Sequence, residues 1–213
     1  ARAAATGKPM IMSTGMATLQ EVEEAVGTAR AAGSGQIALL KCTSAYPASP
    51  EEMNLLSIPD MVKRFGVPVG LSDHTRGIAV AVTAVALGAS IVEKHFTLLR
   101  DESGLDSEFS LEPAEFKAMV KAVRTAEAAL GEVRYGLTER EKPSTVFRRS
   151  LFVVKDMRAG ETFTEENVRS IRPGLGLPPK YLYDIHGRRS SKEISSGTPM
   201  NWELVAGLNR RKP

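Results

Sequence analysis

The sequence predicts an α/β protein with a parallel sheet, followed by a small, mostly-β module. Between residues 8 and 130, short apolar runs alternate four times with segments of helix length. This alternation is typical of right-handed βαβ units, which form parallel sheets. After about residue 150 the apolar runs shorten, and glycine and proline interrupt them, which favours a small β-rich module. We therefore expect domains at 1–131 and 151–213 and a linker at 132–150.

The first domain contains four predicted strand–helix pairs. The apolar runs that predict strands are 8–15, 37–43, 67–71 and 90–95. A capping box formed by Thr18 and Glu21 predicts the start of the first helix, which continues over 22–32. The other helices are expected near Pro50, over 77–87 and over 113–130. The helix over 77–87 is almost entirely apolar, as expected of a helix that packs between a sheet and other elements.

The C-terminal module is expected to begin with a strand over 151–154. A turn follows at 156–160, and Thr164 predicts the N-terminal cap of a short helix. Two segments rich in proline and glycine, 172–179 and 195–199, interrupt the remainder. Such interruptions favour short strands and turns over a fifth strand–helix pair.

Composition places the chain among ordinary globular proteins. Its 213 residues are 42% hydrophobic and 25% charged, with a formal net charge of +3. No apolar run reaches the roughly 20 residues that span a bilayer, and the chain begins without the apolar region of a signal peptide, so we expect a cytoplasmic protein without membrane contact. The basic residues are scattered, which argues against nucleic acid as a partner. The single cysteine, Cys42, excludes an intramolecular disulfide and a thiolate cluster.

Two of the three histidines lie where predicted strands end. His74 follows the third strand, and His95 ends the fourth. Side chains at the carboxyl ends of parallel strands meet in space, so these imidazoles can form one site. A single histidine at such a position is more often a buried core residue, but two in equivalent positions favour a metal site. His186 matches no such position, and we expect it to be structural or exposed.

Four segments of the chain resemble the N-acetylneuraminate (sialic acid) synthase family. They are Lys41-Cys-Thr-Ser-Ala-Tyr-Pro47, Gly70-Leu-Ser-Asp-His-Thr75, Glu93-Lys-His-Phe-Thr97 and Phe163-Thr-Glu-Glu-Asn-Val-Arg-Ser-Ile-Arg-Pro-Gly174. Their number and order make the resemblance specific, and it extends from about Lys8 to Val205. The segments 41–46 and 104–113 look most like the pseudaminic acid branch, because sialic acid synthases usually have asparagine in place of Ser44.

This resemblance implies an enzyme that condenses phosphoenolpyruvate with an amino-sugar aldehyde and releases phosphate. The product would be a nonulosonic (sialic-type) acid for cell-surface polysaccharide or flagellin glycans, with N-acetylneuraminate or legionaminate synthesis as the alternative to the pseudaminic branch. The resemblance also implies a (β/α)8 TIM barrel, an antifreeze-like (SAF) domain and a domain-swapped homodimer. Since the chain has four βα units, it would be the C-terminal half of that barrel, with the N-terminal half absent, and inactive by itself.

The resemblance also implies roles for individual residues. His74 and His95 would hold a divalent cation, manganese first, with magnesium or cobalt as alternatives. Tyr46 and Asp106 would act on the sugar as catalytic residues. The substrate-binding set would consist of Ser13, Ser44, Ser72 and Arg172, the last reaching the barrel of the partner. Considered without the resemblance, each serine is more often a turn residue, Arg172 is a solvated surface residue, and Asp106 is equally well a solvated loop carboxylate.

Two other functional classes remain open. A different enzyme that joins phosphoenolpyruvate to an aldose, such as a 3-deoxy-heptulosonate phosphate synthase, would share the metal and phosphate chemistry but would lack the SAF-like module. A non-enzymatic binding or assembly module would fit an inactive fragment. Strand alternation further predicts that Lys94 points away from the site if His95 points into it, and Lys41 is expected to form a partly buried ion pair.

Overall fold

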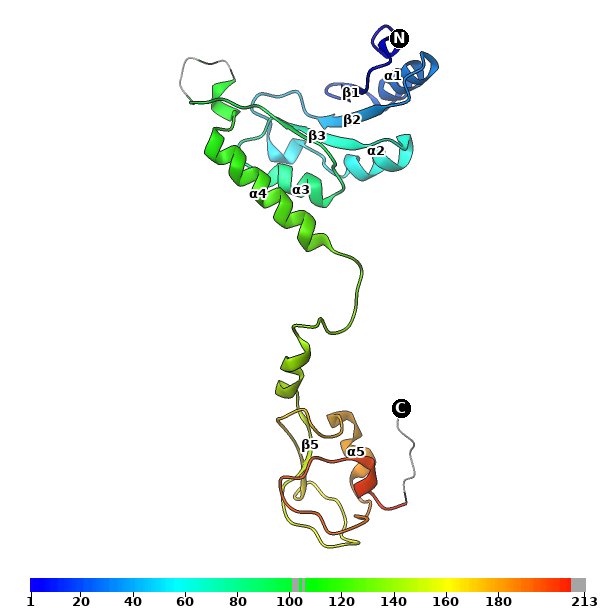
Figure 1. Cartoon of the computed structure of the whole chain (residues 1–213), viewed down its shortest axis with the longest axis vertical. Helices are drawn as coiled ribbons and strands as arrows, with labels where there is room; N and C mark the ends of the chain where they lie inside the picture. Colours follow the sequence, from blue (N-terminus) through cyan, green and yellow to red (C-terminus); the bar gives the residue numbers. More distant parts are fainter. Residues whose placement is uncertain (101–103, 105, 208–213) are drawn as a thin grey trace. The chain divides into compact units, whose positions relative to one another are not determined.

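The chain forms two compact units in the computed structural model, Ala1–Val133 and Arg134–Pro213. The structure describes residues 1–100, 104 and 106–207. Both units are drawn in Figure 1. The boundary between the two units falls within the expected linker.

The first unit is built on a four-stranded parallel sheet. Its strands are β1 (Met10–Ser13), β2 (Ile37–Cys42), β3 (Val69–Asp73) and β4 (Val92–Lys94). They lie in the order β1-β2-β3-β4, and every neighbouring pair is parallel. Four consecutive βα units in sequential strand order form half of a (β/α)8 barrel. The predicted parallel α/β fold is therefore confirmed.

Four α-helices follow the four strands. They are α1 (Leu19–Ala31), α2 (Ser57–Phe65), α3 (Ala79–Ala86) and α4 (Pro113–Leu130). The capping box at the start of α1 is present: the Thr18 hydroxyl accepts from the Glu21 N–H, and the Glu21 carboxylate accepts from the Thr18 N–H at 2.7 Å. Short 3-10 helices add η1 (Ala4–Thr6), η2 (Pro50–Glu52) and η3 (Ser107–Phe109).

The prediction that the second helix begins near Pro50 is wrong. Residues 50–52 form only the 3-10 turn η2, and α2 begins at Ser57. Asn54 between them has a positive φ of 45°. This left-handed conformation interrupts a right-handed helix, so the proline starts a turn that does not continue.

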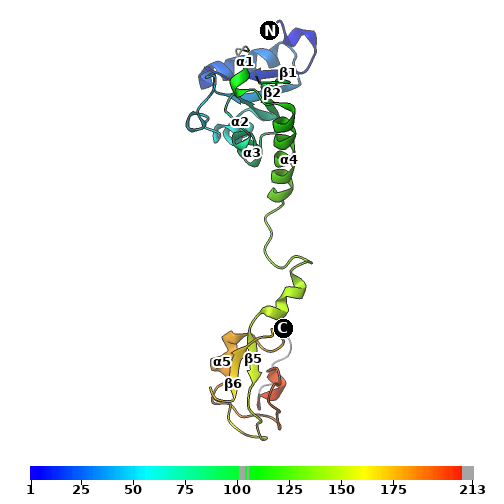
Figure 2. The same cartoon turned by 90° about the vertical axis from the view of Figure 1, so that its left-hand side faces the viewer.

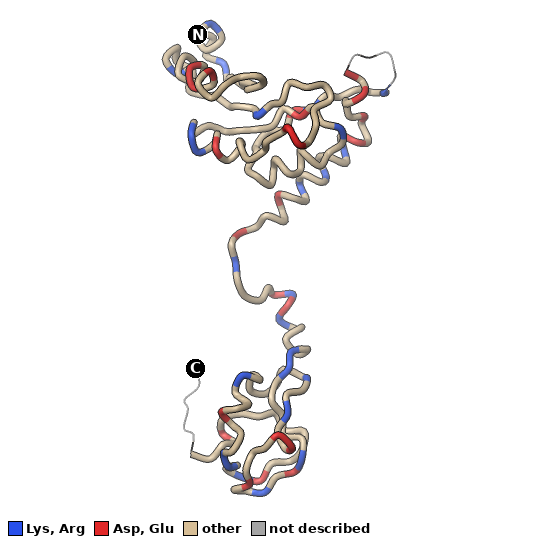
Figure 3. Tube along the Cα trace, turned by 180° about the vertical axis from the view of Figure 1, so that it is seen from behind, with Lys and Arg blue, Asp and Glu red and all other residues tan. Residues whose placement is uncertain are grey.

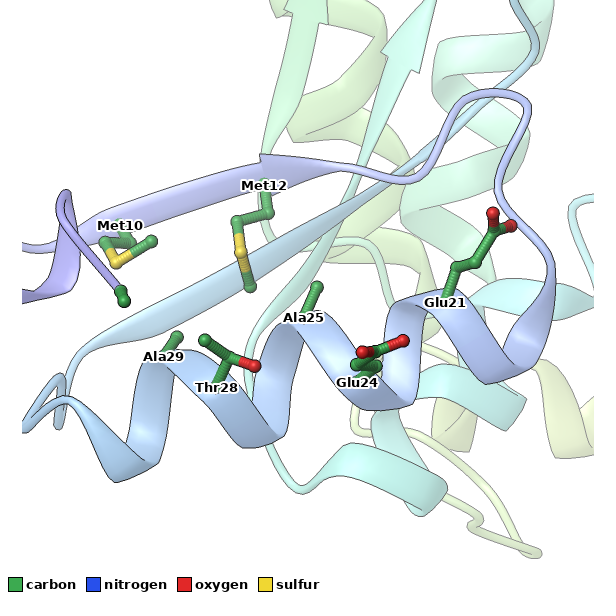
Figure 4. A pocket seen from close by; sticks show the side chains of 8 residues that line it. Met10, Met12, Glu21, Glu24, Ala25, Thr28 and Ala29 are labelled. Atoms are coloured by element: carbon green, nitrogen blue, oxygen red, sulfur yellow. The ribbon is translucent and has the colours of Figure 1, made fainter.

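The helices cover one face of the sheet. Alternate strand residues, among them Leu39, Val69 and Leu71, pack into one core with apolar residues of α1 and α2. In Figure 4, Met10 and Met12 of β1 point toward α1 and line a hollow of about 340 Å³ with the α1 residues Ala25, Thr28 and Ala29, together with Glu21 and Glu24. Figures 1 and 2 show α3 and α4 side by side, and their Ala81 and Met119 share a second core with Leu111.

The opposite face of the sheet carries the intervening residues. Gly70 lies on this face between Leu40 of β2 and Ile91, which precedes β4. A Cβ atom at residue 70 would lie 2.5 Å from the Ile91 carbonyl oxygen and 2.7 Å from Leu40 Cδ2. Glycine therefore allows the two large side chains to approach across β3. On the outer strand β1, Ile11 of the same face is 61% exposed.

The second unit is a small module with its own core. Strand β5 (Ser150–Val153) pairs antiparallel with β6 (Val168–Ile171), and isolated bridges join further segments of the unit, one of them to Phe152 of β5. Its helices are short: η4 (Lys142–Phe147), η5 (Pro179–Tyr181), α5 (Leu182–Ile185) and η6 (Trp202–Leu204). Phe163, Leu151 and Ile185 are fully buried at the centre. The expected β-rich module is present.

The helix expected after Thr164 is replaced by a turn. The Thr164 N–H donates to the Asn167 side chain at 2.7 Å, and the Thr164 hydroxyl accepts from the Glu166 N–H at 3.3 Å. Side chains of these types stabilise turns as well as helix starts. Here the turn leads directly into β6 at Val168.

Charges of both signs are interspersed along the chain. Figure 3 shows Lys and Arg scattered among Asp and Glu in both units. Among the described residues, no helix combines the length and the apolar character needed to cross a bilayer.

Candidate functional site

The carboxyl ends of β3 and β4 bring the two histidines together. Ser72 pairs with Glu93 in the sheet, and Asp73 pairs with Lys94. His74 and His95 follow directly, on the face of the sheet opposite the helices. Their ring centroids are 5.2 Å apart. Residues that are 21 positions apart in the sequence therefore form one imidazole pair.

His74 has one ring nitrogen fixed by the backbone. Its side chain is buried, and Nδ1 lies 3.0 Å from the carbonyl oxygen of Thr43 in the loop after β2. Since a carbonyl oxygen only accepts hydrogen bonds, Nδ1 carries the proton and Nε2 keeps a free lone pair. This is the arrangement in which proteins present histidine to metals. Cys42 Sγ lies 3.9 Å from the same Nδ1.

Two aromatic rings enclose the histidine pair. The Tyr46 ring lies 4.4 Å from His74 and 6.2 Å from His95, between centroids. The Phe109 ring lies 4.9 Å from His95 and 5.7 Å from Tyr46. Phe109 is buried, whereas Tyr46 is 56% exposed. Tyr46 therefore presents its ring and its phenol to an open surface next to the imidazoles.

Asp106 approaches His95 from the loop before η3. Asp106 Oδ2 lies 3.6 Å from His95 Nδ1, and both side chains are partly exposed. This separation is too long for a hydrogen bond, but it places a carboxylate beside the imidazole. Tyr46 and Asp106 thus lie on two different loops around the same histidine pair.

The three serines are placed differently from one another. The Ser72 hydroxyl is buried and donates to Glu93 Oε1 at 2.6 Å. Ser44 Oγ lies 3.9 Å from Cys42 Sγ in the loop after β2. Ser13 ends β1 and is exposed. The three lie at the carboxyl ends of successive strands, as expected, but Ser13 is on the outer strand, two strands from His74.

Gly15 allows the loop after β1 to approach the loop after β2. A Cβ at residue 15 would collide with Ser44 Oγ and would lie 3.1 Å from Cys42 Sγ. A glycine at this position therefore determines how closely the two loops pack beside His74.

Asp73 and Lys94 form a buried ion pair on the helix-facing side of the sheet. Lys94 Nζ lies 2.9 Å from Asp73 Oδ2, and neither side chain is exposed. Lys94 Nζ also donates to the Thr75 carbonyl oxygen. Asp73 Oδ1 accepts from the Thr75 hydroxyl at 2.7 Å and from the Thr75 N–H at 2.9 Å. Lys94 thus points away from the histidine side, as strand alternation predicts.

Lys41 does not form the ion pair that we expected. Its Nζ donates to the Cys42 carbonyl oxygen at 3.0 Å and lies 3.4 Å from the Thr43 hydroxyl. Among the described residues no carboxylate lies within ion-pair distance of it. Burial lowers the pKa of the Lys41 amine, because desolvation disfavours the charged form.

Three neighbours of the site escape prediction from the sequence. Phe109 packs on His95, Cys42 lies beside His74, and Glu93 binds Ser72. Glu93 shares a face with His95 because the two are two positions apart in the sequence, so period-two alternation is the signal that identifies it. The positions of Phe109 and the Thr43 carbonyl depend on loop conformation, for which the sequence has no comparable signal.

Arg172 belongs to the second unit. It follows β6 and is exposed. Within that unit it lies at the start of the segment 172–179, whose Gly176 N–H donates to the Ser150 hydroxyl at 2.9 Å.

Sequential βα units with an imidazole pair at the carboxyl ends of the strands define the class of the first unit, which is a (β/α)8 half-barrel with two histidines at its strand ends. Residues 1–135 match the NeuB family, and residues 148–206 match the SAF domain. The chain belongs to the NeuB family and carries a SAF domain.

Three known proteins illustrate the relationship. Pseudaminic acid synthase of Campylobacter jejuni is 47% identical over 89% of this chain and 55% of its own length. N,N'-diacetyllegionaminic acid synthase of Legionella pneumophila is 39% identical over 92% of this chain and 57% of its own length. The crystal structure of the spore coat polysaccharide biosynthesis protein SpsE of Bacillus subtilis aligns with a TM-score of 0.57 at 34% identity, over 97% of this chain and 63% of that one. The chain spans about half the length of the curated relatives that it matches.

Proposed function

We propose that this chain is part of a nonulosonic acid synthase that condenses phosphoenolpyruvate with an amino-sugar aldehyde and releases phosphate. The observation that carries the proposal is the histidine pair, with centroids 5.2 Å apart, at the strand ends of a NeuB-family half-barrel. The identity of 47% to a pseudaminic acid synthase favours the pseudaminic branch. Such an enzyme is a C–C bond-forming transferase, and we place it in the cytoplasm.

The two imidazoles of the site suit a divalent cation, although among the described residues no third His, Cys, Asp or Glu side chain completes a ligand group with them. His74 offers Nε2 because Nδ1 is bonded to Thr43, and His95 lies beside it with a carboxylate near its Nδ1. Nitrogen and oxygen donors suit manganese, with magnesium or cobalt as alternatives. In this proposal His74 and His95 hold the cation, which would supply Lewis-acid polarisation of the sugar aldehyde.

The surrounding side chains would bind and orient the two substrates. Tyr46 is exposed next to both imidazoles, so its phenol would contact the sugar. The Asp106 carboxylate would accept hydrogen bonds from sugar hydroxyl or amide groups. Ser13 and Ser44 would donate to the phosphate or carboxylate of phosphoenolpyruvate.

Ser72 has a constraint that the other serines lack. Its single hydroxyl proton is donated to Glu93. Ser72 would therefore bind an anion only after this hydrogen bond opens, because a hydroxyl has one proton to donate. The Glu93 carboxylate would also oppose the binding of a phosphate at this position, because like charges repel at short distance.

Arg172 would complete the site from a second subunit. It is exposed in the SAF domain, and its guanidinium can bind a pair of oxygen atoms in fixed geometry. We propose a domain-swapped homodimer in which Arg172 reaches the sugar of the partner.

A second candidate is a synthase for legionaminic or N-acetylneuraminic acid. The identity of 39% to a legionaminic acid synthase supports it. The two branches share their chemistry and differ in the acceptor sugar. A chain that spans 55% of its relative also supports a third reading, in which residues 1–213 alone are an inactive binding or assembly module.

Phosphate release from phosphoenolpyruvate tests the proposal. The assay uses the longest form of the protein that contains residues 1–213, with manganese, and offers 2,4-diacetamido-2,4,6-trideoxy-altrose and N-acetylmannosamine in parallel. We expect turnover with the first sugar only. Turnover with the second only would assign the sialic branch, and no turnover with either in a folded, manganese-bound protein would contradict both the pseudaminic and the sialic assignments and leave another acceptor sugar or an inactive protein.

A further inference from the structure

We propose that Asp73, Lys94 and Thr75 form a buried network that positions the two histidines relative to each other. The inference rests on the proposed metal site. Asp73 and Thr75 flank His74 in the sequence, and Lys94 directly precedes His95. The network therefore joins the backbone on both sides of one histidine to the residue next to the other.

The backbone ladder alone does not hold the histidines in place. The last paired residues of β3 and β4 are Asp73 and Lys94, so both histidines lie just beyond the ladder. At this point Lys94 Nζ bridges Asp73 Oδ2, at 2.9 Å, and the Thr75 carbonyl oxygen. These side-chain hydrogen bonds therefore connect β3 and β4 at the point where their backbone pairing ends.

Hydrogen bonds between its two sequence neighbours also fix the turn that contains His74. Both Thr75 bonds to Asp73 Oδ1, from the hydroxyl and from the N–H, span His74. On the outer side, the His74 carbonyl oxygen accepts from the Ala48 N–H at 3.0 Å, and the His95 carbonyl oxygen accepts from the Leu111 N–H at 2.8 Å. The two imidazoles are therefore presented from backbones that are fixed on both sides.

Stability is a weaker explanation for this ion pair. Both side chains are fully buried, and replacing a buried ion pair by apolar groups of similar size is often neutral or stabilising. The pair lies opposite the histidine face, where it touches neither ring. In this proposal the pair holds the backbone beside both candidate metal ligands, and groups that orient ligands from outside the first coordination shell tune metal affinity.

The experiment separates positioning from stability. The 213-residue chain is compared with Asp73→Asn, with the double variant Asp73→Leu/Lys94→Met, and with Val69→Ala as control. Val69 is buried on the same face of β3, so its truncation destabilises the sheet without altering the network. Manganese affinity is measured from the signal of the free ion in electron paramagnetic resonance. In the metal-free protein, nuclear Overhauser effects between the His74 and His95 ring protons report the geometry.

We expect manganese affinity to fall by about 10- to 100-fold in both network variants, with loss of the ring-to-ring Overhauser effects, and to stay at the parent value in Val69→Ala. If Asp73→Asn does not fold, the double variant decides, since it leaves no buried charge unpaired. A folded network variant with parent affinity overturns the inference. If the parent itself binds no manganese, the proposed metal site fails. The positioning role is then judged from the metal-free spectra, where unchanged ring-to-ring effects overturn it.

Discussion

The imidazole of His74 shows how a single contact defines the chemistry of a side chain. The Thr43 carbonyl oxygen accepts a hydrogen bond from Nδ1, so the tautomer is set by a backbone group that lies 31 residues earlier in the chain. The sequence identifies His74 and His95 through their positions at strand ends. It does not identify Thr43, because the contact is made by a backbone atom that every residue has.

Substitution of the histidines tests the metal site directly. We expect His74→Gln and His95→Gln each to weaken manganese binding by at least about 100-fold, since removing a ligand exceeds the loss from an outer-shell partner. Isothermal titration calorimetry on the 213-residue chain measures this. His186→Gln is the matched control, because His186 lies in the SAF domain. Equal losses in all three variants would contradict a site formed by the pair.

Replacement of glycine by alanine should have opposite effects on stability at Gly70 and Gly27. Gly70→Ala places a Cβ 2.5 Å from the Ile91 carbonyl oxygen, and we expect a loss of about 1–3 kcal/mol in the free energy of unfolding from overpacking. Gly27→Ala lies within α1, where a Cβ meets nothing within 4 Å, and we expect a gain of about 0.5–1 kcal/mol. Urea unfolding followed by circular dichroism checks both. A stabilising Gly70→Ala would refute the packing described across β3.

At the level of elements, the sequence predicts a helix boundary best where a capping residue and the apolar periodicity of the helix agree. The capping box of α1 and the limits of α4 at Pro113 and Leu130 are confirmed. The apparent helix starts at Pro50 and Thr164 are wrong, because the same residue types also begin turns. At Pro50 the backbone of Asn54 interrupts the helix, and at Thr164 the chain turns into β6. These outcomes depend on tertiary packing and not on local preference.

The capping box predicts a pH dependence of stability. Hydrogen bonds from the Thr18 N–H and hydroxyl lower the pKa of Glu21 from 4.5. A lowered pKa in the folded state contributes stability that is present above the unfolded-state pKa and is lost as the pH falls through the folded-state value. The stability difference between parent and Glu21→Gln should therefore shrink as the pH falls below 4.5. Urea midpoints measured across this range check it.

Glu24→Gln is the control for that experiment, because Glu24 lies in α1 but outside the capping box. Its difference from the parent should not follow the Glu21→Gln curve. At neutral pH, Thr18→Ala should lower the free energy of unfolding by about 1 kcal/mol. A Thr18→Ala variant with parent stability at pH 7 would show that the box does not support α1.

At the scale of the whole molecule, two cores predict two unfolding transitions. The core around Phe163 belongs to the unit 134–213, and the core around Ile58 belongs to the unit 1–133. We expect Phe163→Ala to lose about 3–5 kcal/mol and Ile58→Ala about 2–5 kcal/mol. Each should lower the midpoint of one transition in differential scanning calorimetry. A single transition shifted by both variants would contradict independent units.

The composition and the strand–helix alternation are sufficient to predict the parallel sheet and the β-rich module. They also place the two histidines at one edge of the sheet, since parallel strands align their carboxyl ends. They do not predict the hydrogen bond from the Ser72 hydroxyl to Glu93, because that bond depends on the register of β3 against β4. Register follows from the packing of both faces at once, which a single strand does not encode.

The pairing of Asp73 with Lys94 has a further consequence for how the chain folds. If β4 slipped by one residue, Asp73 would lie beside Glu93 or beside His95 in place of Lys94. The first slip sets two carboxylates next to each other, which is unfavourable, and either slip turns every side chain of β4 to the opposite face. The buried pair therefore acts against mispaired strands during folding. A chain with apolar residues at 73 and 94 should show a lower yield on refolding from urea, with more aggregate, even where its folded form is as stable as the parent.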